Sequence, residues 1–99
     1  MSQNNKIHIT PKADEDLENI YLYSVEKFGV KRAVQYINDL DKTFDKLAND
    51  RSLGHDCSYI SPNLKSHRVV SHLIFYKFMA DKVIIIRILH KSMDYKQHF

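Results

Sequence analysis

The sequence contains few of the residues that interrupt or cross-link a chain. Only two glycines and two prolines occur among its 99 residues, so long loops and low-complexity linkers are not expected. The single cysteine, Cys57, excludes a disulfide within the chain and favours a reducing compartment. Because 43% of the residues are hydrophobic, we expect one folded domain over residues 1–99 with one modest core.

Long hydrophobic runs are also missing. The longest wholly apolar run in the last predicted strand covers residues 83–86, far short of the roughly 18 residues that span a membrane. The first five residues are polar and do not form the core of a signal peptide. The sequence therefore predicts a cytoplasmic protein without a membrane partner.

Charge is divided unevenly between the two halves of the chain. Residues 1–50 contain seven Lys/Arg and nine Asp/Glu, whereas residues 51–99 contain eight Lys/Arg, three Asp/Glu and five histidines. A basic C-terminal half favours an acidic partner, either nucleic acid or an acidic protein segment. An ordinary solvated surface explains the same distribution equally well.

The N-terminal half is typical of a short strand followed by a helical hairpin. Apolar and polar residues alternate over positions 6–10, which indicates a strand. Thr10 and Pro11 form a capped helix start, and Gly29 separates two amphipathic stretches. The predicted antiparallel helices cover residues 11–28 and 30–48.

The hydrophobic period changes to two after a polar loop over residues 51–63. The predicted strands cover residues 65–70, 72–79 and 83–90, and a tail over 91–99 forms one helical turn. The element order β-α-α-β-β-β predicts an α+β fold. In this two-layer sandwich the helical hairpin packs on one face of a mostly antiparallel four-stranded sheet.

The last predicted strand is apolar on both faces. Strict alternation places on one face the residues Val83, Ile85, Arg87 and Leu89. Because the single helical layer covers only one face of the sheet, we expect this second face to lack cover from its own chain and to bind a partner. The guanidinium of Arg87 would bind a carboxylate or phosphate there, or would instead pair internally with Asp94 or Glu26.

The basic half contains residue types that suit two kinds of catalytic chemistry. Metal-free RNA cleavage needs a base, an acid and cations for the charge on phosphorus, and the residues of these types are Arg68, Arg87, His90 and Tyr95. Structural roles for His90 and Tyr95 are favoured, because any small basic sheet would show such residues. Only His55 and Cys57, with one residue between them, come near a zinc-ligand spacing, and Gly-rich phosphate loops are absent, so we expect neither a metal nor a cofactor.

Three stretches resemble one known family over about residues 7–98. They are "PKADEDLENIYLYSVEKFG", "SHLIFYKF" and "VIIIRILHKSMD". The chain is similar in these stretches to the ParE toxins of bacterial type II toxin–antitoxin modules, within the RelE/ParE superfamily. It departs from the usual ParE loop, where Pro-Gly-Leu-Arg is common, at residues 62–65, although Asn63 can still adopt a left-handed conformation.

The resemblance implies a fold, an activity and two partners. The fold would be the RelE/ParE α+β sandwich. The activity would be poisoning of DNA gyrase by binding, so the chain would not be an enzyme and would not bind nucleic acid specifically. A ParD-like antitoxin would cover the second sheet face at Val83, Ile85, Arg87 and Leu89. The target-binding residues would lie in the tail: His90, Lys91, Asp94, Tyr95 and Lys96.

The superfamily leaves two alternatives open. RelE relatives cut ribosome-bound mRNA, and their basic cluster would correspond here to Arg68 and Arg87 with His90 or Tyr95, supplemented by Lys42 and Lys46. This chain lacks the denser lysine and arginine set of those nucleases. The other alternative is a toxin relic that retains only antitoxin binding.

Overall fold

The structure, a computed structural model, describes residues 5–99. Four of the five residues on which the predicted absence of a signal sequence rests lie outside this range. The elements are β1 (Ile7–Ile9), α1 (Pro11–Phe28), α2 (Val30–Asn49), β2 (His55–Asp56), β3 (Lys65–Val69), β4 (His72–Met79), β5 (Lys82–His90) and a 3-10 turn, η1 (Tyr95–His98). The two predicted helices, the three long strands and the helical turn of the tail are confirmed.

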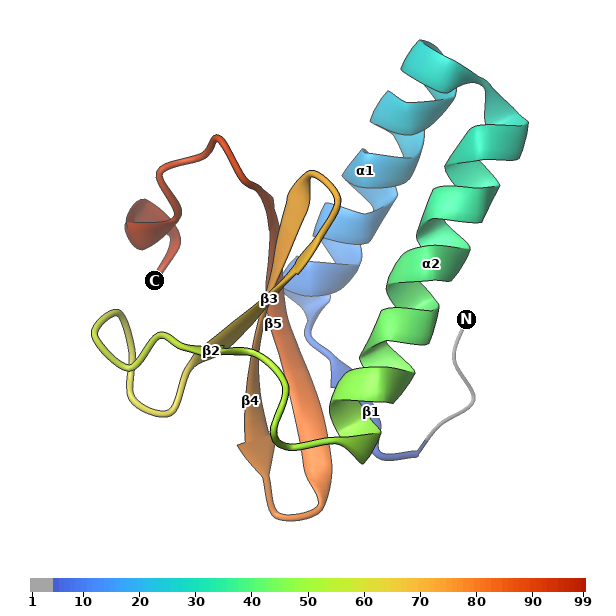
Figure 1. The fold of residues 1–99 in the computed structure, drawn as a ribbon. Helices are drawn as coiled ribbons and strands as arrows, with labels where there is room; N and C mark the ends of the chain where they lie inside the picture. Colours follow the sequence, from blue (N-terminus) through green and yellow to red (C-terminus); the bar gives the residue numbers. More distant parts are fainter. Residues whose placement is uncertain (1–4) are drawn as a thin grey trace.

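The α+β fold is confirmed, with one strand more than expected. The sheet has the order β1-β5-β4-β3-β2, with β1 parallel to β5 and the other pairs antiparallel. The additional strand, β2, is two residues long and lies in the predicted polar loop. Figure 1 shows α1 and α2 on one side of the sheet, and the segment before β3 and the C-terminal tail on the other.

Thr10 joins the edge of the sheet to the first helix. Its hydroxyl accepts a hydrogen bond from the backbone N–H of Ala13 at 3.2 Å, which is an N-cap. The same hydroxyl donates to the carbonyl of Ile86 at 3.0 Å, and its backbone N–H donates to the carbonyl of Ile85 at 3.1 Å. The start of α1 is therefore fastened to the outer edge of β5.

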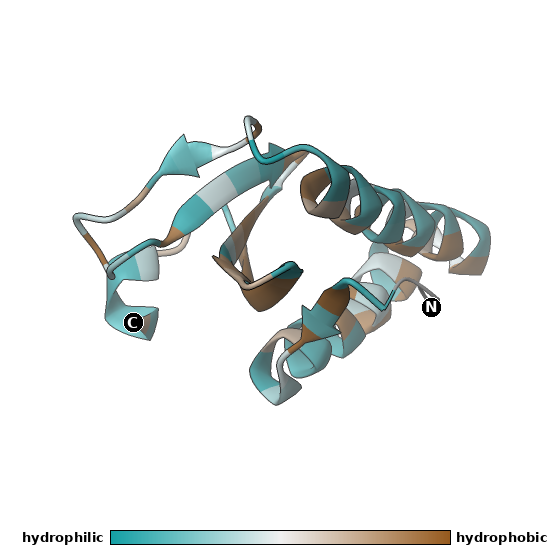
Figure 2. Cartoon of the chain, turned by 90° about the horizontal axis from the view of Figure 1, so that it is seen from below, coloured by the Kyte–Doolittle hydropathy of each residue, from teal (hydrophilic) through white to brown (hydrophobic). Residues whose placement is uncertain are grey.

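The main core lies between the helical hairpin and the sheet. Hydrophobic residues recur along one side of α2 (Figure 2), as the spacing of the sequence predicts. The largest buried side chains of this core are Leu40, Phe44, Leu47, Ile74, Tyr76 and Ile85. The distal ends of the helices, by contrast, extend beyond the sheet (Figure 1), where Phe28 and Val30 are exposed.

A β-bulge in β5 changes which residues share a face. Phe75 pairs with Arg87 and Tyr76 pairs with Ile85, so Ile86 is an extra residue without a partner on β4. An extra residue reverses the side-chain alternation beyond it. Ile85 before the bulge consequently lies in the same core as Ile88 after it.

The prediction of an uncovered face at Val83, Ile85, Arg87 and Leu89 is therefore wrong. Val83 and Ile85 are buried beneath the helices. Leu89 lies on the opposite side of the sheet in a second cluster with Cys57, Leu64 and Phe75, against which Ile60, Leu73, Ile86 and Tyr95 pack. The segment before β3 and the C-terminal tail supply this cover, and the ring of Phe99 lies 5.0 Å from that of Phe75.

The described part of the chain offers neither a helical membrane span nor a cluster of metal ligands. Within residues 5–99 no helix is long and apolar enough to cross a membrane. The same residues contain no group of three or more His, Cys, Asp or Glu side chains placed to hold a metal ion.

Candidate functional site: a groove between the helical hairpin and the sheet

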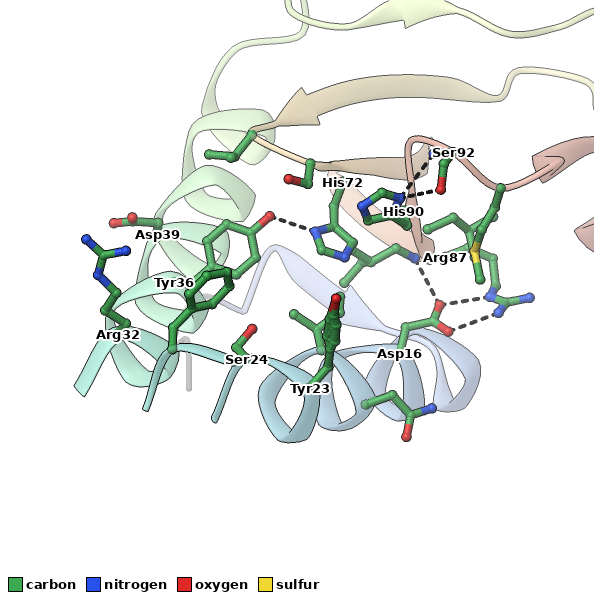
Figure 3. Close-up of a pocket in the computed structure, with 18 of the residues that line it drawn as sticks. Asp16, Tyr23, Ser24, Arg32, Tyr36, Asp39, His72, Arg87, His90 and Ser92 are labelled. Carbon is green, nitrogen blue, oxygen red and sulfur yellow. Dashed lines mark hydrogen bonds and ion pairs between the residues drawn. The ribbon is translucent and has the colours of Figure 1, made fainter. Parts of the chain in front are cut away.

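A groove of about 810 Å³ opens where the helical hairpin diverges from the sheet. Its walls come from α1, from the first half of α2, from the β3–β4 turn and from the last residues of β5 with the start of the tail. Figure 3 shows the side chains of these elements converging on one space. The helical hairpin is longer than the part of the sheet on which it packs (Figure 1). The groove opens where the hairpin extends past that part.

An ion pair closes one end of the groove. The carboxylate of Asp16 on α1 accepts hydrogen bonds from Nε and Nη2 of Arg87 at 2.8 and 2.9 Å. It also accepts one from the backbone N–H of Ile88 at 2.9 Å. Only 12% of the Asp16 side chain and 15% of the Arg87 side chain are exposed. The hydrogen bonds that Arg87 donates to the Asp16 carboxylate raise the pKa of Arg87.

Asp16 thereby takes the place of a neighbouring strand. β1 pairs with β5 only as far as Ile85, which leaves the outer edge of β5 without a partner strand beyond that point. On this edge the backbone N–H of Ile88 donates a hydrogen bond to the Asp16 carboxylate, and the carbonyl of Ile86 accepts one from the Thr10 hydroxyl. Arg87 therefore pairs within the chain, which was one of the two predictions for it. Its partner, however, is Asp16 rather than Asp94 or Glu26.

Tyr36, His72 and His90 form the polar wall of the groove (Figure 3). The Tyr36 hydroxyl donates to the carbonyl of Val69 at 3.1 Å and lies 2.7 Å from Nδ1 of His72. One proton cannot serve both contacts, so Nδ1 of His72 is the donor when the hydroxyl donates to Val69. His90 stacks edge-on against His72 with 5.4 Å between ring centroids, and its Nδ1 lies 2.7 Å from Oγ of Ser92.

The floor of the groove carries little net charge at neutral pH. Burial, followed by the proximity of His90, lowers the pKa of His72 to about 4, so its imidazole is neutral. Burial likewise raises the pKa of Tyr36, and Asp16 and Arg87 compensate each other. The remaining charged residues of the lining, Arg32 and Asp39, are exposed and lie at the outer edge (Figure 3).

The rim of the groove carries exposed apolar side chains beside Arg32 and Asp39. Its apolar side chains come from α1, from the β3–β4 turn and from the start of the tail: Tyr23, Phe28, Val70 and Met93. Contiguous apolar surface around a concave site is typical of a protein-docking surface. A floor of low net charge with apolar side chains at the rim suits a hydrophobic polypeptide segment better than a charged small molecule.

Only two of the four proposed nuclease residues line the groove. Arg87 and His90 line the groove, but Arg68 and Tyr95 do not. The Nε of Arg68 donates to the carbonyl of Val70, and Tyr95 packs against Phe75 on the opposite side of the sheet. Lys42 and Lys46 line a separate depression beside His67.

The predicted target-binding residues comprise the last residue of β5 and four residues of the tail that follows it. Lys91, Asp94 and Lys96 are exposed, whereas His90 and Tyr95 are half-buried. Nζ of Lys96 lies 5.8 Å from the ring centroid of Tyr59. The segment therefore both covers the second cluster and presents charged side chains to the solvent.

Sequence reasoning missed Asp16, Tyr36 and Val70 as residues of the site. Asp16 is one of three acidic residues near the start of the first helix, and Tyr36 is one of several tyrosines on the helices, so nothing local marks either as part of a site. Val70 occupies a left-handed conformation, with φ 50°, which no signal in the sequence demands. Asn63, for which such a conformation was allowed, has φ 63°.

The structure defines the class of the fold: a small α+β domain in which a helical hairpin covers one face of a mostly antiparallel sheet. A chain described as "Chromosomal ParDE TA system from P. aeruginosa" superposes with a TM-score of 0.74 over 86% of this chain and 94% of that chain, at 20% sequence identity. At this identity the likeness shows the fold alone.

The family follows from the sequence comparisons. Residues 7–95 match the family described as "ParE toxin of type II toxin-antitoxin system, parDE". Toxin ParE1 of Mycobacterium tuberculosis is 31% identical over 87 residues, which cover 87% of this chain and 89% of that protein. Toxin ParE1 of Caulobacter vibrioides is 30% identical over 90 residues, which cover 91% and 93%. The chain belongs to the ParE toxin family of type II toxin–antitoxin systems.

Proposed function

We propose that this chain is a toxin that binds and poisons DNA gyrase in the cytoplasm and that a ParD-like antitoxin neutralises it. Membership of the ParE family supports both partners. The toxin acts by binding rather than by catalysis. This part of the proposal is supported by the sparser set of lysines and arginines and by Arg68, whose Nε already donates to the carbonyl of Val70.

The observation that carries the antitoxin site is the groove. It offers a floor of low net charge, exposed apolar side chains at its rim and a volume of about 810 Å³, which suit the apolar face of a peptide segment. This site replaces the sheet face at Val83, Ile85 and Leu89, whose side chains the fold buries.

The segment that fills the groove is an amphipathic helix rather than an added strand. Strand addition uses free N–H and C=O groups along a sheet edge. On the β5 edge beside the groove, the N–H of Ile88 is already hydrogen-bonded to Asp16, and the carbonyl of Ile86 is already hydrogen-bonded to Thr10. A helix brings a backbone whose hydrogen bonds are already made and therefore needs only the apolar contacts.

Gyrase is expected to contact the exposed segment after β5. This segment lies next to the groove, because two of its residues, Ser92 and Met93, line the groove. A bound antitoxin would therefore cover part of the gyrase-binding surface, which explains neutralisation without a change in the fold.

Induction of the chain in cells tests the activity. A gyrase poison triggers the DNA-damage response and filamentation while bulk transcripts stay intact, and the purified chain stabilises cleaved DNA in a gyrase reaction. Rapid cleavage of translated mRNA would show that the chain is a ribosome-dependent endonuclease instead. Absence of a growth defect with antitoxin binding retained would show a relic.

A matched pair of variants tests the target-binding segment. The double variant Lys91→Ala/Lys96→Ala should weaken gyrase inhibition at least about tenfold, because both ammonium groups are exposed in this segment. Lys82→Ala removes an exposed lysine at the opposite end of β5 and should leave inhibition unchanged. Equal effects of the two changes would refute a contact by the tail.

A further inference from the structure

The β3–β4 turn contains a residue that is unfavourable for its conformation. Val69 pairs with His72, so only Val70 and Ser71 connect the strands, and Val70 has φ 50°. Turns of this length prefer Gly, Asn or Asp at positions with positive φ. A β-branched side chain is a true outlier there.

The strained turn is held from both sides by long side chains. The Tyr36 hydroxyl on α2 binds the carbonyl of Val69 at 3.1 Å. The Nε of Arg68 on β3 binds the carbonyl of Val70 at 2.9 Å. These contacts, together with the ladder between β3 and β4, fix where the Val70 side chain stands.

The folded chain gains little from the valine itself. Val70 is 70% exposed, so its side chain adds little to the core, and Gly or Asn would satisfy the backbone better. The same side chain lines the groove and forms part of its apolar rim. Strain that persists without an internal benefit is typical of functional sites.

We propose that the β3–β4 turn presents Val70 as a pre-positioned apolar anchor for the antitoxin helix that fills the groove. The proposal rests on the proposed function, since it assigns a specificity-determining contact within the same site. A side chain fixed before binding loses little conformational entropy when it is buried. The helix should therefore place an aliphatic or aromatic residue against Val70, and it should bear no charge at that position.

Two variants with the same new residue test the anchor. Val70→Asn removes the apolar side chain and introduces a residue that tolerates positive φ. Ala80→Asn makes the same change at φ 55° in the β4–β5 turn, at the other end of the sheet. The probe is the full-length antitoxin encoded beside the toxin reading frame, and the measurements are Kd by calorimetry and Tm by circular dichroism.

Both variants should melt at or above the temperature of the wild-type chain, because each relieves backbone strain. Only Val70→Asn should weaken antitoxin binding, at least about tenfold, which is the effect of losing one buried valine-sized side chain. Unchanged affinity of Val70→Asn would overturn the anchor while leaving the proposed function intact. A lower Tm for Val70→Asn alone would show that the valine serves the fold and would overturn it as well.

Two other outcomes concern the occupant. If the wild-type chain does not bind the antitoxin at all, the proposed function fails and the anchor fails with it. Sedimentation of the toxin alone tests a second copy as the occupant. A dimer that Val70→Asn converts to a monomer would overturn the assignment to the antitoxin.

Discussion

Replacement of Asp16 by alanine should destabilise the fold more than the loss of any other carboxylate on α1. The change leaves the guanidinium of Arg87 without its carboxylate and the N–H of Ile88 without its acceptor. Breaking a fully buried ion pair costs about 3–5 kcal/mol, and an unsatisfied buried donor costs about 1–3 kcal/mol. Because both side chains keep slight exposure, 12% and 15%, we expect a loss of about 3 kcal/mol in the free energy of unfolding.

The assay is urea denaturation followed by circular dichroism, with Glu18→Ala as the matched control. Glu18 lies two residues further along the same helix and is exposed, so its removal should cost less than about 0.5 kcal/mol. Asp16→Asn should be intermediate, because its amide oxygen can still accept from Ile88. A loss of about 3 kcal/mol corresponds to a Tm decrease of at least about 12 °C in a domain of this size.

A double-mutant cycle separates the pair from the backbone contact. Asp16→Asn and Arg87→Met should together cost less than the sum of the single changes, with a coupling of about 1–2 kcal/mol. The reasoning is refuted if Asp16→Ala is no more destabilising than Glu18→Ala, or if the two residues show no coupling.

Three further outcomes follow from other contacts. Because burial lowers the pKa of His72 to about 4, below its ordinary value of about 6.5, its contribution to stability is complete above pH 6.5 and is lost as the pH falls toward 4. His72→Gln should flatten the dependence of unfolding free energy on pH in that window, and equal slopes would contradict this. Tyr95→Ala should lower the unfolding free energy by about 2 kcal/mol in urea denaturation, since the ring packs on the second cluster; no loss would mean that the tail does not cover this face. Gly54→Ala should lower the unfolding free energy by more than about 2 kcal/mol, because a Cβ there would overlap the hydroxyl of the buried Tyr76. Gly29→Ala, where a Cβ would have nothing within 4 Å, should lower it by only about 1 kcal/mol. Equal melting temperatures for the two variants would contradict the overlap.

The helices and long strands were predictable because their signals are local. Thr10 and Pro11 start α1 as expected, Gly29 separates the helices, and β4 has the predicted bounds. Capping, glycine punctuation and hydrophobic period act within a few residues of the chain. The two-residue strand β2 carries too short a pattern to be found in this way.

The faces of β5 were not predictable. Nothing in the run of isoleucines marks Ile86 as the extra residue of a bulge, because the bulge arises from the pairing of β5 with β4. Side chains alternate between the two faces of the sheet on each side of Ile86, but the extra residue reverses the order between the two parts. Strict alternation along the whole strand therefore wrongly predicts Val83 and Leu89 on one face.

The sequence by itself determined the order of elements, the two-layer α+β class and the likeness to the ParE family, all of which depend on neighbouring residues. Only the tertiary structure decided that Asp16 on α1 holds Arg87, that the tail covers the second face, and that a groove opens between the helical hairpin and the sheet. Asp16 and Arg87 are 71 positions apart in the chain. Contacts over such distances depend on how the elements pack, which no local pattern encodes.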